Sequence, residues 1–109
     1  MCAAVNKCIL VGCIGTKGFE LRYAPHGTAV ASFYLACSEV WGDEKAHTTY
    51  IPCEVLGKRA EAVTHLAPGT AVVVDGKIMR RKVGERWETV VGCWDLAPIT
   101  VPATSAEVT

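Results

Sequence analysis

Features that would point to a membrane-bound, secreted or catalytic protein are missing from this sequence of 109 residues. No run of eighteen apolar residues is present, and the N-terminus lacks the basic segment, apolar core and cleavage site of a signal peptide. The sequence also lacks a Ser/His/Asp set, a paired-carboxylate motif and a phosphate-binding loop. We therefore expect a soluble, cytoplasmic protein that is not an enzyme.

Neither sign of charge is in excess, because 11 Lys and Arg balance 11 Asp and Glu. Composition alone thus gives no argument for a polyanionic partner. The basic residues are nevertheless clustered, since ten positions with a single acid, Glu85, contain Lys77, Arg80, Arg81, Lys82 and Arg86. This stretch is either a local positive face or the solvated tip of a hairpin.

The six cysteines form no C-x-x-C pair and the three histidines are far apart in sequence, so we expect neither zinc nor another cofactor. So many cysteines in a short chain could instead form a disulfide framework. Four of them, however, lie in hydrophobic strand-like runs, where a thiol behaves as a small apolar group: Cys8, Cys37, Cys53 and Cys93. We predict that these cysteines are reduced and buried.

Hydrophobic periodicity divides the chain into five strands and one helix. The strands are predicted at residues 5–14, 28–40, 48–56, 70–81 and 86–96. A helix is predicted at residues 57–66, where Ala60, Val63 and Leu66 recur every three residues before Pro68 and Gly69. Because Pro52 cannot donate a ladder hydrogen bond, it must lie at an edge or a bulge.

This order of elements predicts an all-β fold, a five-stranded OB-fold Greek-key barrel with one short helix between strands 3 and 4. An SH3-like barrel would explain the strand count but not a helix at that place. We assign residues 1–98 to the OB-fold domain and predict that residues 99–109, rich in Thr and Ala, form a flexible C-terminal end.

Short motifs follow one another along most of the chain. They are VNK at 5–7, ILVG at 9–12, ELRY at 20–23, GTAVA at 27–31, LACSE at 35–39 with Trp41, LGKRAE at 56–61, PGT at 68–70, and DGKI at 75–78 with RRK at 80–82. In this order they resemble the bacterial single-stranded DNA-binding protein family. The resemblance implies a nucleoid-associated homotetramer that coats single-stranded DNA in replication, recombination and repair.

Binding of a single strand requires aromatic surfaces for the bases and positive charge for the phosphates. By the resemblance, Trp41 and Tyr50 stand where the family places base-stacking aromatics, although Trp41 could instead cap the barrel and Tyr50 pack inside it. Trp87 and Tyr34 are further candidates, but Trp87, like Trp94, could be structural. The candidate phosphate contacts are Lys7, Arg22, Lys58, Lys77, Arg80, Arg81, Lys82 and Arg86.

Some positions depart from the family pattern. Val83 and Leu56 stand at usual aromatic positions, and Ile51 replaces a histidine that supports subunit contacts. The acidic tip that recruits replication and repair proteins is not found at residues 106–109. Two other classes therefore stay open, a dimeric primosomal-type accessory protein that contacts replication proteins and a small nuclease.

Overall fold

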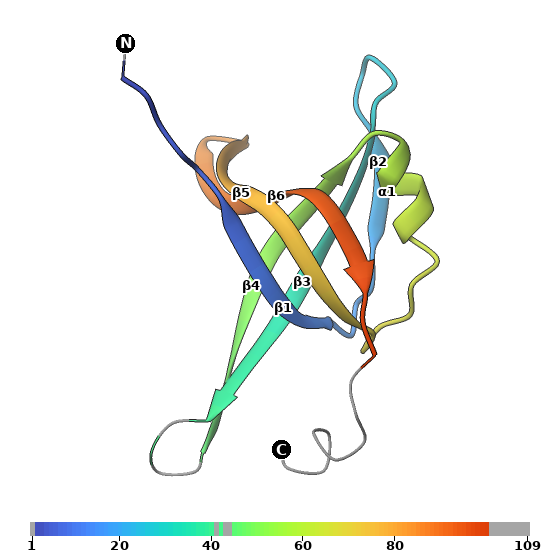
Figure 1. Ribbon diagram of the computed structural model, residues 1–109. Helices are drawn as coiled ribbons and strands as arrows, with labels where there is room; N and C mark the ends of the chain where they lie inside the picture. Colours follow the sequence, from blue (N-terminus) through green and yellow to red (C-terminus); the bar gives the residue numbers. More distant parts are fainter. Residues whose placement is uncertain (1, 41, 43–44, 101–109) are drawn as a thin grey trace.

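The computed structural model describes residues 2–40, 42 and 45–100, which form six strands and one helix (Figure 1). No helix among these residues has the length and apolarity needed to cross a membrane. The elements are β1 (Cys8–Ile14), β2 (Glu20–Tyr23), β3 (Ala29–Val40), β4 (Ala46–Leu56), α1 (Lys58–Val63), β5 (Ala71–Val83) and β6 (Arg86–Pro98).

Five of these strands close into a barrel. The sheet order is β1-β5-β6-β4-β3-β2, and β1 also pairs with β3 where Cys13 and Ile14 meet Ala36 and Leu35. A short parallel pairing between β4 and β6 completes the ring, and the other pairings are antiparallel. The predicted all-β OB-fold barrel is therefore confirmed.

The helix, however, lies between β4 and β5 and not between the third and fourth strands as predicted. The difference arises from β2, which was not predicted and which pairs only with β3, outside the closed ring. Its four residues are all exposed, so they carry no burial pattern that distinguishes a strand from a loop. Gly27, at a φ of 96°, completes the turn that joins β2 to β3.

Alternation along β3 and β4 separates the core from the outer surface. Ala31, Phe33 and Leu35 of β3 are buried in the barrel, and the ring of Phe33 lies 4.8 Å from that of Phe19. Tyr34, between the buried residues, is 49% exposed on the outside. Pro52 lies where β4 has only β3 as a partner, just before its pairing with β6 begins, so the predicted edge position is confirmed.

The cysteines are free, and Cys53 and Cys93 are buried as predicted, whereas Cys8 and Cys37 are half-buried. A hydrogen bond with Cys93, together with burial, raises the pKa of the Cys53 thiol. Burial, followed by the neighbouring Cys13 and Cys8, raises the pKa of Cys37. Since the thiolate is the reactive form, these thiols are poor nucleophiles in the folded protein.

We expect Cys53 to react with iodoacetamide far more slowly than the exposed Cys2 and Cys13, which mass spectrometry of the alkylated native protein will measure. We also expect Cys8→Val and Cys37→Thr to leave the fold intact, because packing groups of similar size replace the thiols. Loss of the fold in either variant, or rapid labelling of Cys53, would show that the thiols are more than packing groups.

Candidate nucleic-acid interface

A groove follows the outer face of β4. Its floor consists of the alternate residues that point away from the core, Tyr50, Pro52, Glu54 and Leu56. Three hollows, of about 270, 500 and 220 Å³, lie along this row and are lined by these residues and their neighbours. From Tyr50 to Leu56 the strand rises by roughly 20 Å at ~3.3 Å per residue, so the groove is an extended path across the barrel. We use "the groove" for these three hollows.

The first hollow is aromatic. Tyr34 and Tyr50 line it together with Lys17 and the loop at residues 15–18. Tyr34 is paired with Pro52 and Tyr50 with Ala36, so the two tyrosines are diagonal neighbours on one face of the β3–β4 ladder. Tyr50 is 63% exposed and therefore does not pack in the barrel. The structure thus brings two predicted aromatics together, whereas Trp41 lies outside the described residues.

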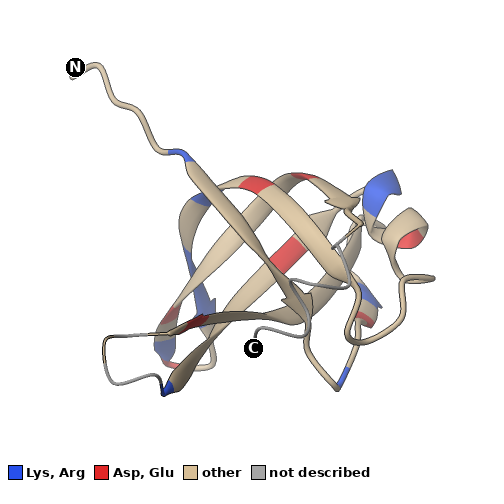
Figure 2. Cartoon of the chain, turned by 60° about the horizontal axis from the view of Figure 1, so that its bottom comes forward, with Lys and Arg blue, Asp and Glu red and all other residues tan. Residues whose placement is uncertain are grey.

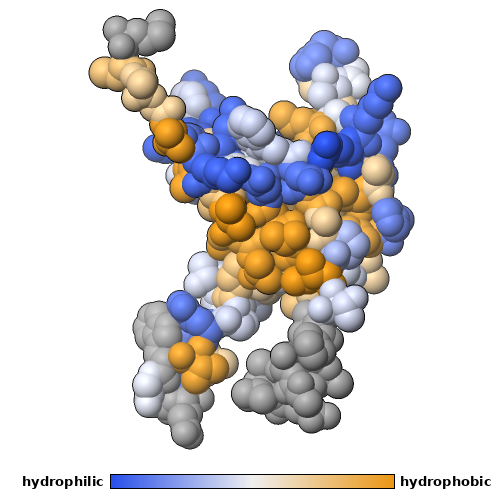
Figure 3. Space-filling model, viewed as in Figure 1, coloured by the Kyte–Doolittle hydropathy of each residue, from blue (hydrophilic) through white to orange (hydrophobic). Residues whose placement is uncertain are grey.

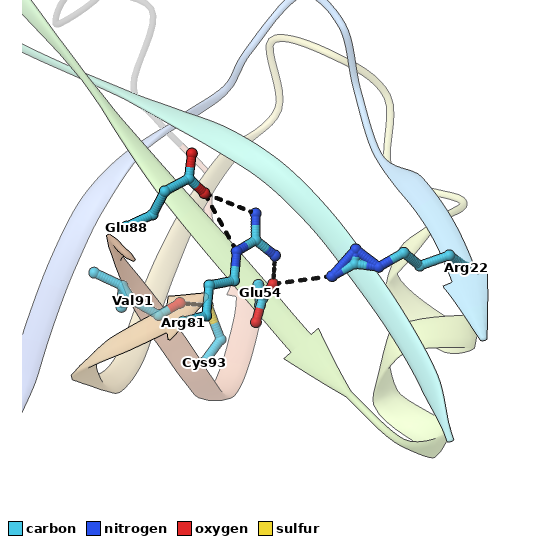
Figure 4. A network of polar contacts seen from close by, with 6 residues as sticks. All are labelled: Arg22, Glu54, Arg81, Glu88, Val91 and Cys93. Carbon is cyan, nitrogen blue, oxygen red and sulfur yellow. Dashed lines mark hydrogen bonds and ion pairs between the residues drawn. The ribbon is translucent and has the colours of Figure 1, made fainter. Parts of the chain in front are cut away.

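A network of ion pairs borders the central and largest hollow. Glu54, at the neighbouring third hollow, is 6% exposed, and its carboxylate forms ion pairs with Arg22 of β2, at 3.2 Å, and with Arg81 of β5, which both line the central hollow (Figure 4). Arg81 also donates to Glu88 of β6 at 3.3 Å. Four strands therefore meet at this network. A carboxylate removed from water needs such partners.

This network changes the interpretation of two predicted phosphate contacts. Arg22 and Arg81 line the central hollow, but each is already paired with an acid, so a phosphate would have to compete with Glu54 for them. Glu54 was not predicted as a site residue from the sequence. The signal was present, because a lone acid follows Cys53 and precedes Val55 and Leu56 inside a predicted strand.

The third hollow is mainly apolar. Leu56, Met79 and Trp94 line it, together with Lys77. Trp94 is 64% exposed, and the Nζ atom of Lys77 lies 5.8 Å from the centroid of its ring. Lys77, a predicted phosphate contact, is thus at the groove, and Trp94, whose role the sequence left open, is on the surface and not in the core.

The basic residues of the β5–β6 hairpin are divided between two faces. The register pairs Arg80 with Thr89, Arg81 with Glu88 and Lys82 with Trp87, without irregularity in this part of the ladder. Successive residues of a strand point to opposite faces, so Arg81 faces the central hollow while Arg80 and Lys82 face away with Trp87. Around the barrel, basic and acidic residues are interspersed (Figure 2). The clustered basic residues are thus divided, and Arg80 and Lys82 keep one face of the hairpin while Arg81 is turned to the other.

The remaining predicted residues lie outside the three hollows. Lys7 is paired with Asp75 at 3.4 Å, and Lys58 is the first residue of α1. Trp87 is 58% exposed on the hairpin. The predicted residues that line the groove are Tyr34, Tyr50, Arg22, Lys77 and Arg81, and those that do not are Lys7, Lys58, Arg80, Lys82, Arg86 and Trp87.

Lys17 is a further residue at the groove that the sequence analysis missed. It lines both the aromatic and the central hollow from the loop after β1. Only its place between Gly15 and Gly18 could have drawn attention to it, because glycine-bounded loops next to a barrel rim often carry function.

Comparison with known protein families gives one match over most of the chain. Residues 5–91 match the model of the Single-strand binding protein family. The match includes β1 to β5 with the aromatic and central hollows, and it ends before Trp94. The resemblance stated from the motifs is thereby confirmed. The chain belongs to the single-strand binding protein family, and single-stranded DNA is the partner that this membership supports.

Proposed function

We propose that this protein coats single-stranded DNA along the groove and protects it in replication, recombination and repair. The observation that carries the proposal is the pair of exposed rings, Tyr34 and Tyr50, beside Lys17 at one end of the groove. Unpaired bases stack on such rings, and each stack is worth about 1 to 3 kcal/mol. Stacking therefore allows a protein without net charge to bind a polyanion.

Little sequence preference is expected. Base-edge recognition in a duplex needs an element that enters a groove and presents donors and acceptors. The helix of the described residues, α1, has six residues and packs its Ala60 and Val63 into the domain. Ring faces stack on any base, because every base has a π-face.

The proposal is tested by titrating the protein with poly-thymidine while its tryptophan fluorescence is followed. We expect saturable quenching and a site size within the range of about 4 to 16 nucleotides per barrel. Absence of saturable binding at low salt and micromolar protein would contradict the proposal. Incubation of a labelled oligonucleotide with protein and magnesium, in which we expect no cleavage, tests the alternative of a nuclease.

We propose a second set of phosphate contacts outside the groove, on the face of the hairpin that carries Trp87. Arg80 and Lys82 are both exposed beside Trp87, and no ion pair holds either of them within the described part of the chain. Replacing both by alanine is expected to weaken binding at low salt and to flatten the slope of log K against log salt by roughly 0.7 for each phosphate that is no longer bound.

Arg59→Ala is the matched control for the hairpin variant, because Arg59 is a basic residue of α1 paired with Asp95 at 2.6 Å, away from the hairpin. Its salt slope should equal that of the wild type. Binding measured by anisotropy of a labelled oligonucleotide at several salt concentrations separates the variants. An unchanged slope in the Arg80/Lys82 variant would remove the hairpin from the site.

We propose further that the protein is a homo-oligomer, a tetramer with two-fold axes. Figure 3 shows a patch of apolar residues below a belt of hydrophilic ones, on the side of the barrel where β1 and β5 lie in front. Ile9 and Val11 of β1 are 64% and 59% exposed, and Val11 is paired with Val73. A patch of this kind marks an interface.

Light scattering at micromolar protein measures the assembly, and sedimentation mass separates a tetramer from the dimer of the primosomal-type alternative. A monomer would contradict the proposed interface. As part of the same proposal, residues 1–98 form the DNA-binding domain, and the protein acts in the cytoplasm at the nucleoid. Of the C-terminal end predicted at residues 99–109, residues 101–109 lie outside the described part of the chain.

A further inference from the structure

We propose that Trp94 is the platform of an additional nucleobase subsite at the far end of the groove, with Leu56 and Met79 as its apolar floor and Lys77 as its phosphate contact. The inference rests on the proposed function, because it extends the path of the same bound strand by one hollow. Trp94 lies beyond residues 5–91, so the family match does not assign it a role.

The exposure of Trp94 is the first observation. An indole buries much apolar area when it packs, yet this one is 64% exposed and does not belong to the core cluster. It lines a hollow of about 220 Å³ with Leu56, itself 50% exposed. Two large apolar side chains thus leave an uncovered surface of the size and kind that a flat ring can occupy.

The backbone is shaped to hold Trp94 there. Asp75 pairs with Asp95, whereas Gly76 pairs with Cys93, so Trp94 is the extra residue of an irregularity in the β5–β6 ladder. Such a bulge leaves one residue unpaired and redirects its side chain, often beside a functional site. Without the bulge, β6 would continue the regular pairing, and Trp94 would be paired with a residue of β5.

Charge and continuity identify the occupant as a nucleotide of the strand bound in the groove. The Nζ atom of Lys77 lies 5.8 Å from the centroid of the indole, close enough for a cation–π contact and for a phosphate next to a stacked base. Glu54 lines the third hollow with Trp94, and its ion-pair partners Arg22 and Arg81 line the central hollow. The two hollows therefore adjoin at this network, and DNA that leaves the central hollow continues to Trp94.

The test uses a protein in which Trp41 and Trp87 are replaced by phenylalanine, so that Trp94 is the one remaining tryptophan. Binding of a fluorescein-labelled thymidine oligonucleotide is measured by anisotropy, and Trp94 emission is recorded on the same titration with unlabelled oligonucleotide. We expect the emission to be quenched in step with binding. An abasic oligonucleotide of equal length should bind more weakly and quench little.

In the otherwise unaltered protein, Trp94→Ala is expected to raise the Kd by roughly fivefold or more, as the loss of one stacked base requires, while Trp94→Phe keeps most of the affinity. Tyr23→Ala is the control, because Tyr23 is an aromatic 59% exposed on β2 that lines none of the three hollows. Its Kd should be that of the wild type.

The possible results distinguish failure of the proposed subsite from failure of the proposed function. Wild-type protein that does not bind the oligonucleotide would overturn both. Saturable binding by anisotropy with unchanged Trp94 emission, or with a Trp94→Ala Kd equal to that of wild type, would overturn the subsite alone. If Trp94 emission changes on dilution of the protein but not on addition of DNA, the hollow is covered by a second copy of the chain. That result would also overturn the subsite.

Discussion

Replacing Tyr34 and Tyr50 together by alanine is expected to weaken the binding of a thymidine oligonucleotide by about 2 kcal/mol or more, since each stacked base contributes about 1 to 3 kcal/mol. The slope of log K against log salt should stay nearly constant, because no phosphate contact is removed. Both rings are on the outer face of the sheet, 49% and 63% exposed, so their removal leaves no cavity in the core. Anisotropy titrations over a range of salt concentrations measure both quantities.

The matched variants are Tyr34→Phe with Tyr50→Phe, which keeps both rings, and Tyr23→Ala, which removes an exposed aromatic outside the groove. Both should bind as the wild type does within a few-fold. A folded alanine double variant with wild-type affinity at every salt concentration would show that the tyrosines do not stack bases. The assignment would then move to Trp41 and Trp87.

Replacing Glu54 by alanine is expected to lower the free energy of unfolding by about 2 to 4 kcal/mol. Breaking a fully buried ion pair costs about 3 to 5 kcal/mol, and the loss is smaller here because the side chain of Arg22 is 47% exposed and that of Arg81 27%. Urea unfolding followed by circular dichroism measures the change. Stability equal to wild type would show that the guanidinium groups find other partners.

Glu54→Gln separates the effect of charge from that of shape. The amide fills the same space but no longer neutralises the arginines, so Arg22 becomes available to a phosphate, and Arg81 keeps Glu88 as its one acidic partner among the described residues. We expect tighter binding at low salt and a salt slope steeper by roughly 0.7 for each arginine that gains a phosphate. Glu61→Gln, which removes an acid from α1 outside the groove, is the charge-matched control. Equal slopes for the two variants would contradict the role given to Glu54.

The barrel could be predicted from the sequence because its strands alternate. In β3 the buried Ala31, Phe33 and Leu35 alternate with Ser32 and Tyr34, and a period of two is visible without any knowledge of the fold. The strand β2 could not be predicted in this way, because all four of its residues are exposed and β3 is the one strand that it pairs with among the described residues. The same alternation puts Tyr34 on the outer face, where it is 49% exposed.

The rest of the site depends on contacts between distant segments. The pairing of Glu54 with Arg22 and Arg81 requires β2, β4 and β5 to meet, and no local pattern encodes that meeting. The position of Trp94 depends on an irregularity opposite Gly76, which periodicity does not reveal. For the hairpin, closeness in sequence was misleading, since Arg80 and Arg81 are adjacent but face opposite sides.

If the groove holds unpaired bases on exposed rings, it must distinguish a single strand from a duplex. We would compare the affinities, in one buffer, for a labelled single strand and for the duplex of the same sequence and length. Because the bases of a duplex are stacked on one another and cannot reach Tyr34 and Tyr50, we expect much tighter binding of the single strand, with the difference persisting at high salt. Equal affinity for the two forms would contradict it.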